Sequence, residues 1–284
     1  MLVKKKCLYV FFAICLICFI RPALAEETDS KDKPWKKVAI DVGYLITSID
    51  TSVNLAAKGL GVEVDAEEFF GMDTTNSVAK INGFWRFTDN LRHRLDLQWS
   101  SYRRDGYKKI GRDFTFEDKN GNEFVIKAGT EVNSHFNLDM YKVSYSYSFF
   151  QDDRIDLAAA IGLYWMPIDI GVDSTGLIRV REEESFDAPL PTIGLRADFS
   201  ITPKWFIRSK LNLFYLEIDQ FKGSIYESTV ALEYLPWKHV GFGLAFDTFN
   251  LHIEADGEDY PEIDFRGTIN FNTTGLLLYA KMFF

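Results

Sequence analysis

Cysteine is almost absent from this chain. All three cysteines, Cys7, Cys15 and Cys18, lie in the first 18 of its 284 residues. The rest of the chain therefore has no disulfide bond, no thiolate nucleophile and no cysteine ligand for a metal. Long apolar runs are also absent beyond residue 25, where no stretch of 18 apolar residues occurs. The sequence thus excludes a transmembrane helix in this part.

Basic charge is scarce as well. The chain has 32 Lys and Arg against 41 Asp and Glu, a net charge of −9, and without residues 1–25 the balance is 28 against 41, or −13. Nucleic acid is therefore excluded as a partner, because binding it requires a basic face. No spacing matches a calcium loop, and no cofactor is expected. Acidic segments 182–184 and 254–264 are expected to be solvated; cations bridging them to lipopolysaccharide are the alternative.

Residues 1–25 have the pattern of a secretory signal peptide. Lys4, Lys5 and Lys6 precede an apolar run over residues 7–20, and Ala23 and Ala25 form a small-x-small cleavage site. The apolar run is shorter than the ~20 residues that a membrane-spanning helix needs. We therefore expect cleavage after residue 25, a loose periplasmic tail over residues 26–36, and one domain over residues 37–284.

From residue 37 onward, apolar and polar residues alternate. In the clearest run, residues 141–149, Tyr, Val and Phe alternate with Lys and Ser. A period of two predicts β-strands. The alternation shifts by one residue after Thr47, Pro167 and Asp247 and near Thr273. Each shift predicts either a β-bulge or a strand that has left the bilayer.

The connections between these segments alternate in length. Short turns at residues 88–90, 151–153, 202–204 and 236–239 alternate with longer connections, one of which contains Asn120-Gly121, a hairpin signal. Short turns at one rim and long loops at the other are typical of transmembrane barrels. We predict an all-β fold, a closed antiparallel transmembrane β-barrel of about ten strands, with eight or twelve as alternatives. A soluble sandwich also alternates, but its strands are usually shorter, at about 5–6 residues.

The two faces of the strands predict a lipid-facing surface and a polar interior. Aromatic girdles are expected near the short turns and at the opposite ends of the strands: Trp85, Phe87, Phe149, Phe199, Trp205, Tyr234, Trp237 and Phe284 in the first, and Tyr44, Trp99, Trp165, Tyr215 and Phe246 in the second. The expected interior charges are Lys80, Arg86, Arg92, Arg94, Lys142, Arg154, Arg196, Arg208, Lys210, Lys281, Asp41, Asp96, Asp156, Asp198, Glu227, Glu233 and Asp247.

Because unpaired buried charges are costly, these residues are expected to form an ion-pair network that fills the lumen. A narrow polar pore, using space at Gly162, Gly194, Gly241 and Gly243, is the alternative. If the interior binds a ligand, the candidates are Arg86, Arg94, Asp96, Asp156, Arg196, Asp198, Arg208 and Glu233. Weak catalytic candidates at the outer rim are His135, and His252 with Glu254 on the same face. Solvated rim histidines are the commoner case.

The final strand, residues 273–284, ends on Phe284. It resembles the closing strand of bacterial outer-membrane barrels, in which a terminal Phe is read by the assembly machinery. Segments 145–150, 188–191, 239–243 and 275–279 resemble a set of uncharacterised proteobacterial outer-membrane barrel proteins. The resemblance implies a monomer in the Gram-negative outer membrane, in contact with lipid and lipopolysaccharide. The expected role is structural or in surface interaction; the alternatives are a narrow channel for small solutes and a rim-site hydrolase acting on lipid A or peptides.

Overall fold

The computed structural model describes residues 34–55, 62–111, 113–117, 123–174, 184–186, 189–218, 221–255 and 267–284, and most of these form β-strands. The predicted signal peptide, residues 26–33 of the tail, Asn120-Gly121 and most of both acidic segments lie outside the described residues. The strands of the ring are β1 (Val38–Leu55), β3 (Thr75–Arg86), β4 (His93–Lys109), β7 (Glu131–Gln151), β8 (Ile155–Trp165), β11 (Pro189–Thr202), β12 (Trp205–Ile218), β13 (Phe221–Tyr234), β14 (Val240–Ala255) and β15 (Gly267–Phe283).

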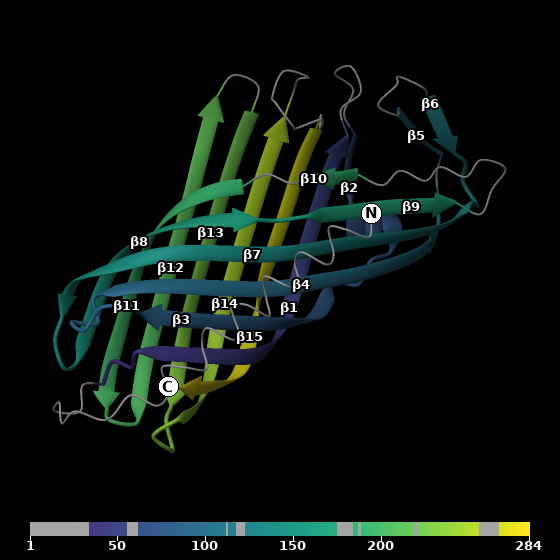
Figure 1. Ribbon diagram of the computed structural model, residues 1–284. Coiled ribbons are helices and arrows are strands. Elements are labelled where there is room, and N and C mark those ends of the chain that lie inside the picture. The colour runs from purple at the N-terminus through teal and green to yellow at the C-terminus, as the bar shows by residue number, and fades with distance from the viewer. Residues whose placement is uncertain are drawn as a thin grey trace, which may run out of the picture. The chain divides into compact units, whose positions relative to one another are not determined.

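These ten strands close into an antiparallel barrel, as predicted (Figure 1). Each strand pairs with its neighbours in the sequence, β7 pairs with β8, and the first strand, β1, pairs with the last, β15. The pairing of β1 and β15 runs without a break from Ala39↔Phe283 to Asn54↔Thr268. Closure therefore leaves no open edge along the ring.

Three short strands extend the ring at the end opposite the short turns. Pro167 separates β8 from β9 (Ile168–Ser174), and both pair with β7. β10 (Glu184–Phe186) pairs with β9, and β2 (Val62–Asp65) pairs with the end of β1. The connection between β4 and β7 contains the predicted hairpin, which is formed by β5 (Phe114–Glu117) and β6 (Glu123–Ile126).

The four predicted short turns connect β3 to β4, β7 to β8, β11 to β12 and β13 to β14. In the second of them, the Asp152 carboxylate accepts hydrogen bonds from the backbone N–H groups of Arg154 and Ile155, both at 2.7 Å. These two donors hold the pKa of Asp152 below its usual value. Side-chain acceptors of this kind replace the ladder partners that the turn residues lack.

An apolar belt covers the outside of the barrel beside the short turns. Val42, Ile161 and Ile193 leave 57%, 63% and 67% of their surface exposed. Of the predicted girdle aromatics, all but Trp99 leave more than a third of their surface exposed. Such a belt is stable only in contact with lipid. We call this part of the barrel the membrane tier.

Within the described ranges, no helix is both long and apolar enough to cross a membrane.

Beyond the membrane tier, the polarity of the wall inverts. On β14 the inward residues change from Gly243 and Asp247 to Phe249 and Leu251, while the outward residues change from Phe246 to polar ones. The β14–β15 and β1–β15 registers continue through this point without a bulge. Of the two explanations for the phase shifts in β1, β14 and β15, a strand leaving the bilayer is therefore correct. We call this part, with its polar outside and apolar inside, the upper tier.

An outward-facing charge should destabilise the barrel in the membrane tier but not in the upper tier of the same strand. Leu278→Arg, in the membrane tier of β15, should lower the free energy of unfolding by about 2–4 kcal/mol, because the charge enters hydrocarbon. Asn272→Arg is the matched control, since it lies on the same face of β15 but in the upper tier, paired with Asp50. Urea unfolding from lipid vesicles measures both variants, and equal losses would contradict the tier boundary.

Candidate functional site

Three layers of side chains fill the barrel interior. At the short-turn end lies an apolar cluster, here the lower plug, which contains Trp35, Ala39, Phe84, Phe206, Leu235 and Phe283. Trp35 precedes β1 and is only 4% exposed. Its indole N–H donates to the Asp152 carbonyl oxygen at 2.6 Å, and its ring packs edge-on against Phe206 at 6.5 Å. The tail expected to be loose is thus anchored at Trp35, and the plug covers the ring mouth.

Above the plug lies the ion layer, in which charged side chains pair across the lumen. Lys80 of β3 contacts Asp247 of β14 at 2.8 Å, and Lys142 of β7 contacts Glu227 of β13 at 2.5 Å. The strands of each pair are three and four positions apart in the ring. These contacts therefore connect opposite walls of the barrel and do not merely join neighbouring strands.

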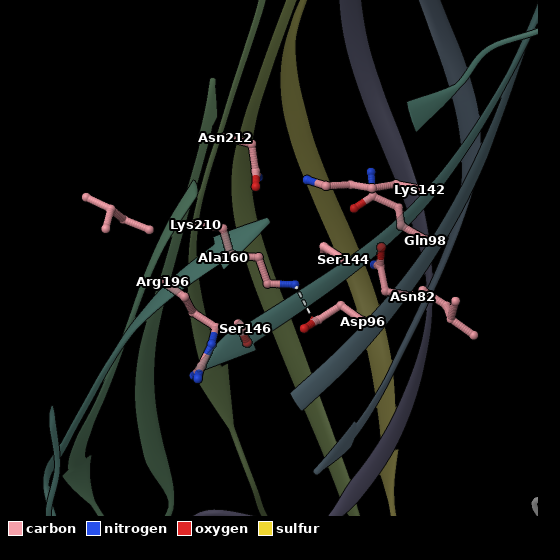
Figure 2. A pocket seen from close by; sticks show the side chains of 12 residues that line it. Asn82, Asp96, Gln98, Lys142, Ser144, Ser146, Ala160, Arg196, Lys210 and Asn212 are labelled. Carbon is pink, nitrogen blue, oxygen red and sulfur yellow. Dashed lines mark hydrogen bonds and ion pairs between the residues drawn. The ribbon is translucent and has the colours of Figure 1, made fainter. Parts of the chain in front are cut away.

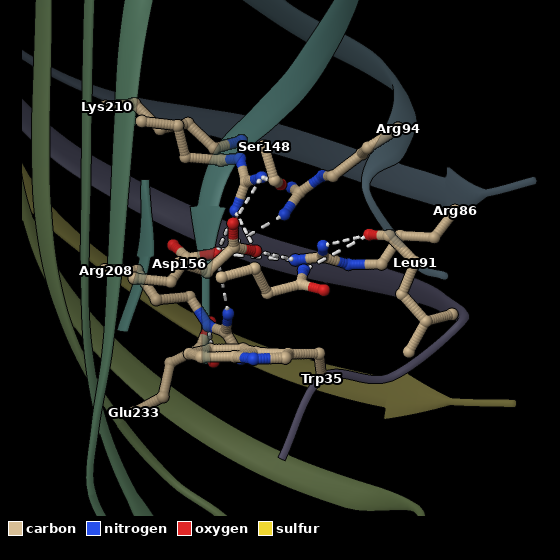
Figure 3. Close-up of polar contacts among 12 residues, drawn as sticks. Trp35, Arg86, Leu91, Arg94, Ser148, Asp156, Arg208, Lys210 and Glu233 are labelled. Carbon is tan, nitrogen blue, oxygen red and sulfur yellow. Dashed lines mark hydrogen bonds and ion pairs between the residues drawn. The ribbon is translucent and has the colours of Figure 1, made fainter. Parts of the chain in front are cut away.

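The densest part of the ion layer surrounds Asp156 and Asp198, which are both fully buried. Figure 3 shows Asp156 with Arg86, Arg94 and Arg208 around it. Arg86 donates to Asp156 at 2.7 Å, and Arg196 bonds both carboxylates. Arg208 reaches Asp198 at 3.2 Å and also pairs with Glu233. Arginine suits this position because its planar fork serves two carboxylates at once. The structure thus brings together all eight predicted lumen residues, with Arg94 joined to Asp96 at 2.5 Å.

The third layer, the upper core, closes the lumen with apolar side chains. The ring of Phe271 on β15 stacks on Phe136 of β7 at 5.5 Å and meets Tyr102 of β4 at 5.4 Å. Tyr164 of β8 lies 5.8 Å from Phe249 of β14. Because β7 and β15 lie four strands apart in the ring, these rings span the lumen from wall to wall.

A short helix, α2 (Ala66–Phe70), lies against the upper core. Asp65 caps its first turn by accepting from the Glu68 N–H at 2.6 Å, and Gly71 ends it in the left-handed conformation at φ 68°. The helix presents Glu67 to Arg104, which is 3% exposed, at 2.5 Å. This pair neutralises the one charged side chain that the described part of β4 buries inside the upper tier.

Between the lower plug and the upper core, the interior contains a cavity of about 30 Å³ (Figure 2). Such a volume holds about one or two water molecules. The glycines that a pore could use face neighbouring side chains: a Cβ on Gly243 would lie 2.1 Å from Cζ of Tyr279. Tyr279 uses that space to donate to Glu233 at 2.7 Å. Its bulk therefore fills the lumen at Gly243.

The histidine candidates do not share a site. His135 lies 3.7 Å from Asp169, and His252 lies 3.8 Å from Glu254, both as half-buried side chains on the outside of the upper tier. Their strands, β7 and β14, are five positions apart in either direction around the ring. His135 does line an open groove of about 370 Å³ with Asp105, Tyr107 and Asn133. Within the described residues, no group of three His, Cys, Asp or Glu could hold a metal ion.

Two predicted lumen cations are misplaced. Arg92 lies before β4 begins, and Arg154 is exposed in the turn before β8. Beyond the end of a strand, side chains no longer point to fixed faces, so alternation does not predict their orientation there. Sequence reasoning also missed Trp35, although a lone tryptophan in a polar tail is a signal for burial, and it missed α2.

The lipid-facing belt, closed ring and polar, packed interior define a transmembrane β-barrel of the outer-membrane class. No family model matches the chain, and no curated protein matches it. Solved structures with a similar fold include the outer membrane protease OmpT from Escherichia coli, at TM-score 0.49 and 10% identity over 90% of this chain and 99% of that one. The transport unit of the autotransporter AIDA-I from Escherichia coli gives 0.45 and 7% over 95% and 97%. The P. putida toluene transporter TodX gives 0.36 and 8% over 87% and 90%. These likenesses are too distant to support a function.

The ion layer should be far more sensitive to loss of a charge than the outer surface. Asp198→Asn leaves Arg196 and Arg208 without a carboxylate they share, and it should lower the free energy of unfolding by about 3–5 kcal/mol. Asp139→Asn is the matched control, because its partner Arg103 is 52% exposed and such pairs are worth about 0–1 kcal/mol. Urea unfolding in vesicles compares the two, and a similar small loss for both would refute a cooperative ion layer.

Proposed function

We propose that this protein is a structural component of the bacterial outer membrane whose upper tier serves surface interactions. The observation that carries the proposal is the filled interior, with an apolar plug, an ion layer and an apolar core stacked along the lumen. A barrel built to pass solutes keeps a water-filled path, whereas this one uses its interior to hold opposite walls together. Its upper tier continues the wall beyond the lipid-facing belt and presents a polar outer surface.

The proposal includes an orientation and a route to the membrane. The short turns and Trp35 face the periplasm, and the upper tier projects outside the cell, as in barrels with short periplasmic turns. The chain is exported by the signal peptide of residues 1–25, cleaved after Ala25, and inserted by the barrel assembly machinery that reads Phe284. It resides as a monomer among outer-membrane lipid and lipopolysaccharide of a Gram-negative cell.

The two alternatives have less support. A narrow channel would need a continuous water-filled path along the lumen. The interior cavity has a volume of only about 30 Å³, and the stacked rings of Phe136 and Phe271 lie above it. A rim hydrolase would need a base and a nucleophile side by side. Ser134, next to His135 in the sequence, points into the barrel, while His135 points out.

Planar-bilayer recording of the purified, folded protein tests the proposal. We expect no unitary conductance steps, in contrast to an open porin inserted under the same conditions. Trp35→Ala should also give no steps, because the ion layer and the upper core remain above the missing indole. Stable steps of uniform size from the unaltered protein would reject a filled lumen and favour the channel.

A further inference from the structure

The cavity in the ion layer has a wall rich in cations. Its lining includes Lys142, Arg196 and Lys210, together with Ser146, Asn212 and a single carboxylate, Asp96 (Figure 2). Lys210 points into the barrel, yet 35% of its side-chain surface remains accessible, more than for its partner Asp96 at 14%. Lys210 is therefore the least buried of the charged side chains that line the cavity.

The charges of the described ion layer do not cancel. It contains eight cations, Lys80, Arg86, Arg94, Lys142, Arg196, Arg208, Lys210 and Lys281, and seven carboxylates, Asp41, Asp96, Asp156, Asp198, Glu227, Glu233 and Asp247. Six of the cations can each be assigned a carboxylate of their own within 4 Å. One positive charge therefore remains.

The surplus charge lies at the cavity. After the six pairs are assigned, Arg94 and Lys210 remain, and both contact Asp96, at 2.5 Å and 3.2 Å. A carboxylate neutralises one cation, so the second charge faces the cavity uncompensated. An uncompensated charge inside a protein is strongly destabilising, and a bound counter-ion removes that penalty.

Buried donors beside the cavity also lack acceptors. The hydroxyl of Ser146, a residue that is 2% exposed, has no hydrogen-bond partner, and neither has Nε–H of Arg196. Arginine can only donate, so a partner for its Nε–H must be an acceptor. Buried groups of this kind are normally satisfied by water or an ion.

We propose that the cavity is a binding site for one small monovalent anion, chloride in the cell. The anion completes the neutralisation that Asp96 provides for only one of its two cations, Arg94 and Lys210. The small volume of the cavity, about 30 Å³, favours an ion of this size over sulfate, phosphate and carboxylate ligands. The carboxylate of Asp96 in the wall further disfavours a multiply charged anion.

Bromide, which replaces chloride and scatters anomalously, tests the site in crystals of the full-length mature barrel. We expect an anomalous peak in the cavity beside Lys210. Lys210→Met removes the surplus charge and should abolish the peak, whereas Lys204→Met, the same change in an exposed turn, should leave it. A wild-type cavity without a peak, or a peak that persists in Lys210→Met, overturns the proposal.

Thermal unfolding gives a second readout that does not depend on crystals. At equal ionic strength, the midpoint of the wild-type protein should be higher in chloride than in gluconate, which is too large for the cavity. The two salts should give the same midpoint for Lys210→Met, because that variant has equal numbers of interior cations and carboxylates. A wild-type midpoint that is the same in both salts means that Lys210 is neutral or only hydrated, and it rejects the anion site.

Discussion

Hydrocarbon tolerates no unpaired strand edge, and the rest of this structure depends on that constraint. Each open N–H or C=O group in the bilayer would cost several kcal/mol, so β1 must pair with β15 along its whole length. Closure with ten strands then sets the width of the lumen. A lumen of that width is too wide to be left empty and narrow enough for side chains from opposite walls to meet. The three interior layers are the consequence.

The same strands pass through two solvents. In the membrane tier the apolar residues face lipid, and the interior is joined by ion pairs such as Lys80–Asp247. In the upper tier, water surrounds the wall and the hydrophobic effect drives Phe249 and Phe271 inward. Since the backbone ladder is continuous across the boundary, only the side chains record where the membrane ends. A single barrel is thus stabilised by two different driving forces along its axis.

Much of this was readable in the sequence, because a period of two is a strong signal when it persists over ten strands. The closed antiparallel ring of about ten strands, the girdles and the interior carboxylates all followed from alternation and turn lengths. Alternation cannot predict which charged residue on the opposite wall pairs with a given charged residue across the lumen. Arg86 and Asp156 are 70 residues apart, and only shear and closure bring them together. The surplus cation at Asp96 and the burial of Trp35 depend on the same three-dimensional placement.

Trp35 has a mechanical consequence for the barrel. A ring of strands resists stretching along its ladders but ovalises easily when it is squeezed from the side. Trp35 lies just before β1. Its indole donates a hydrogen bond to Asp152 in the turn between β7 and β8, and its ring packs against Phe206 of β12. These three points are spread around the circumference. The indole therefore acts as a strut across the mouth, which keeps the cross-section round under the lateral pressure of the bilayer.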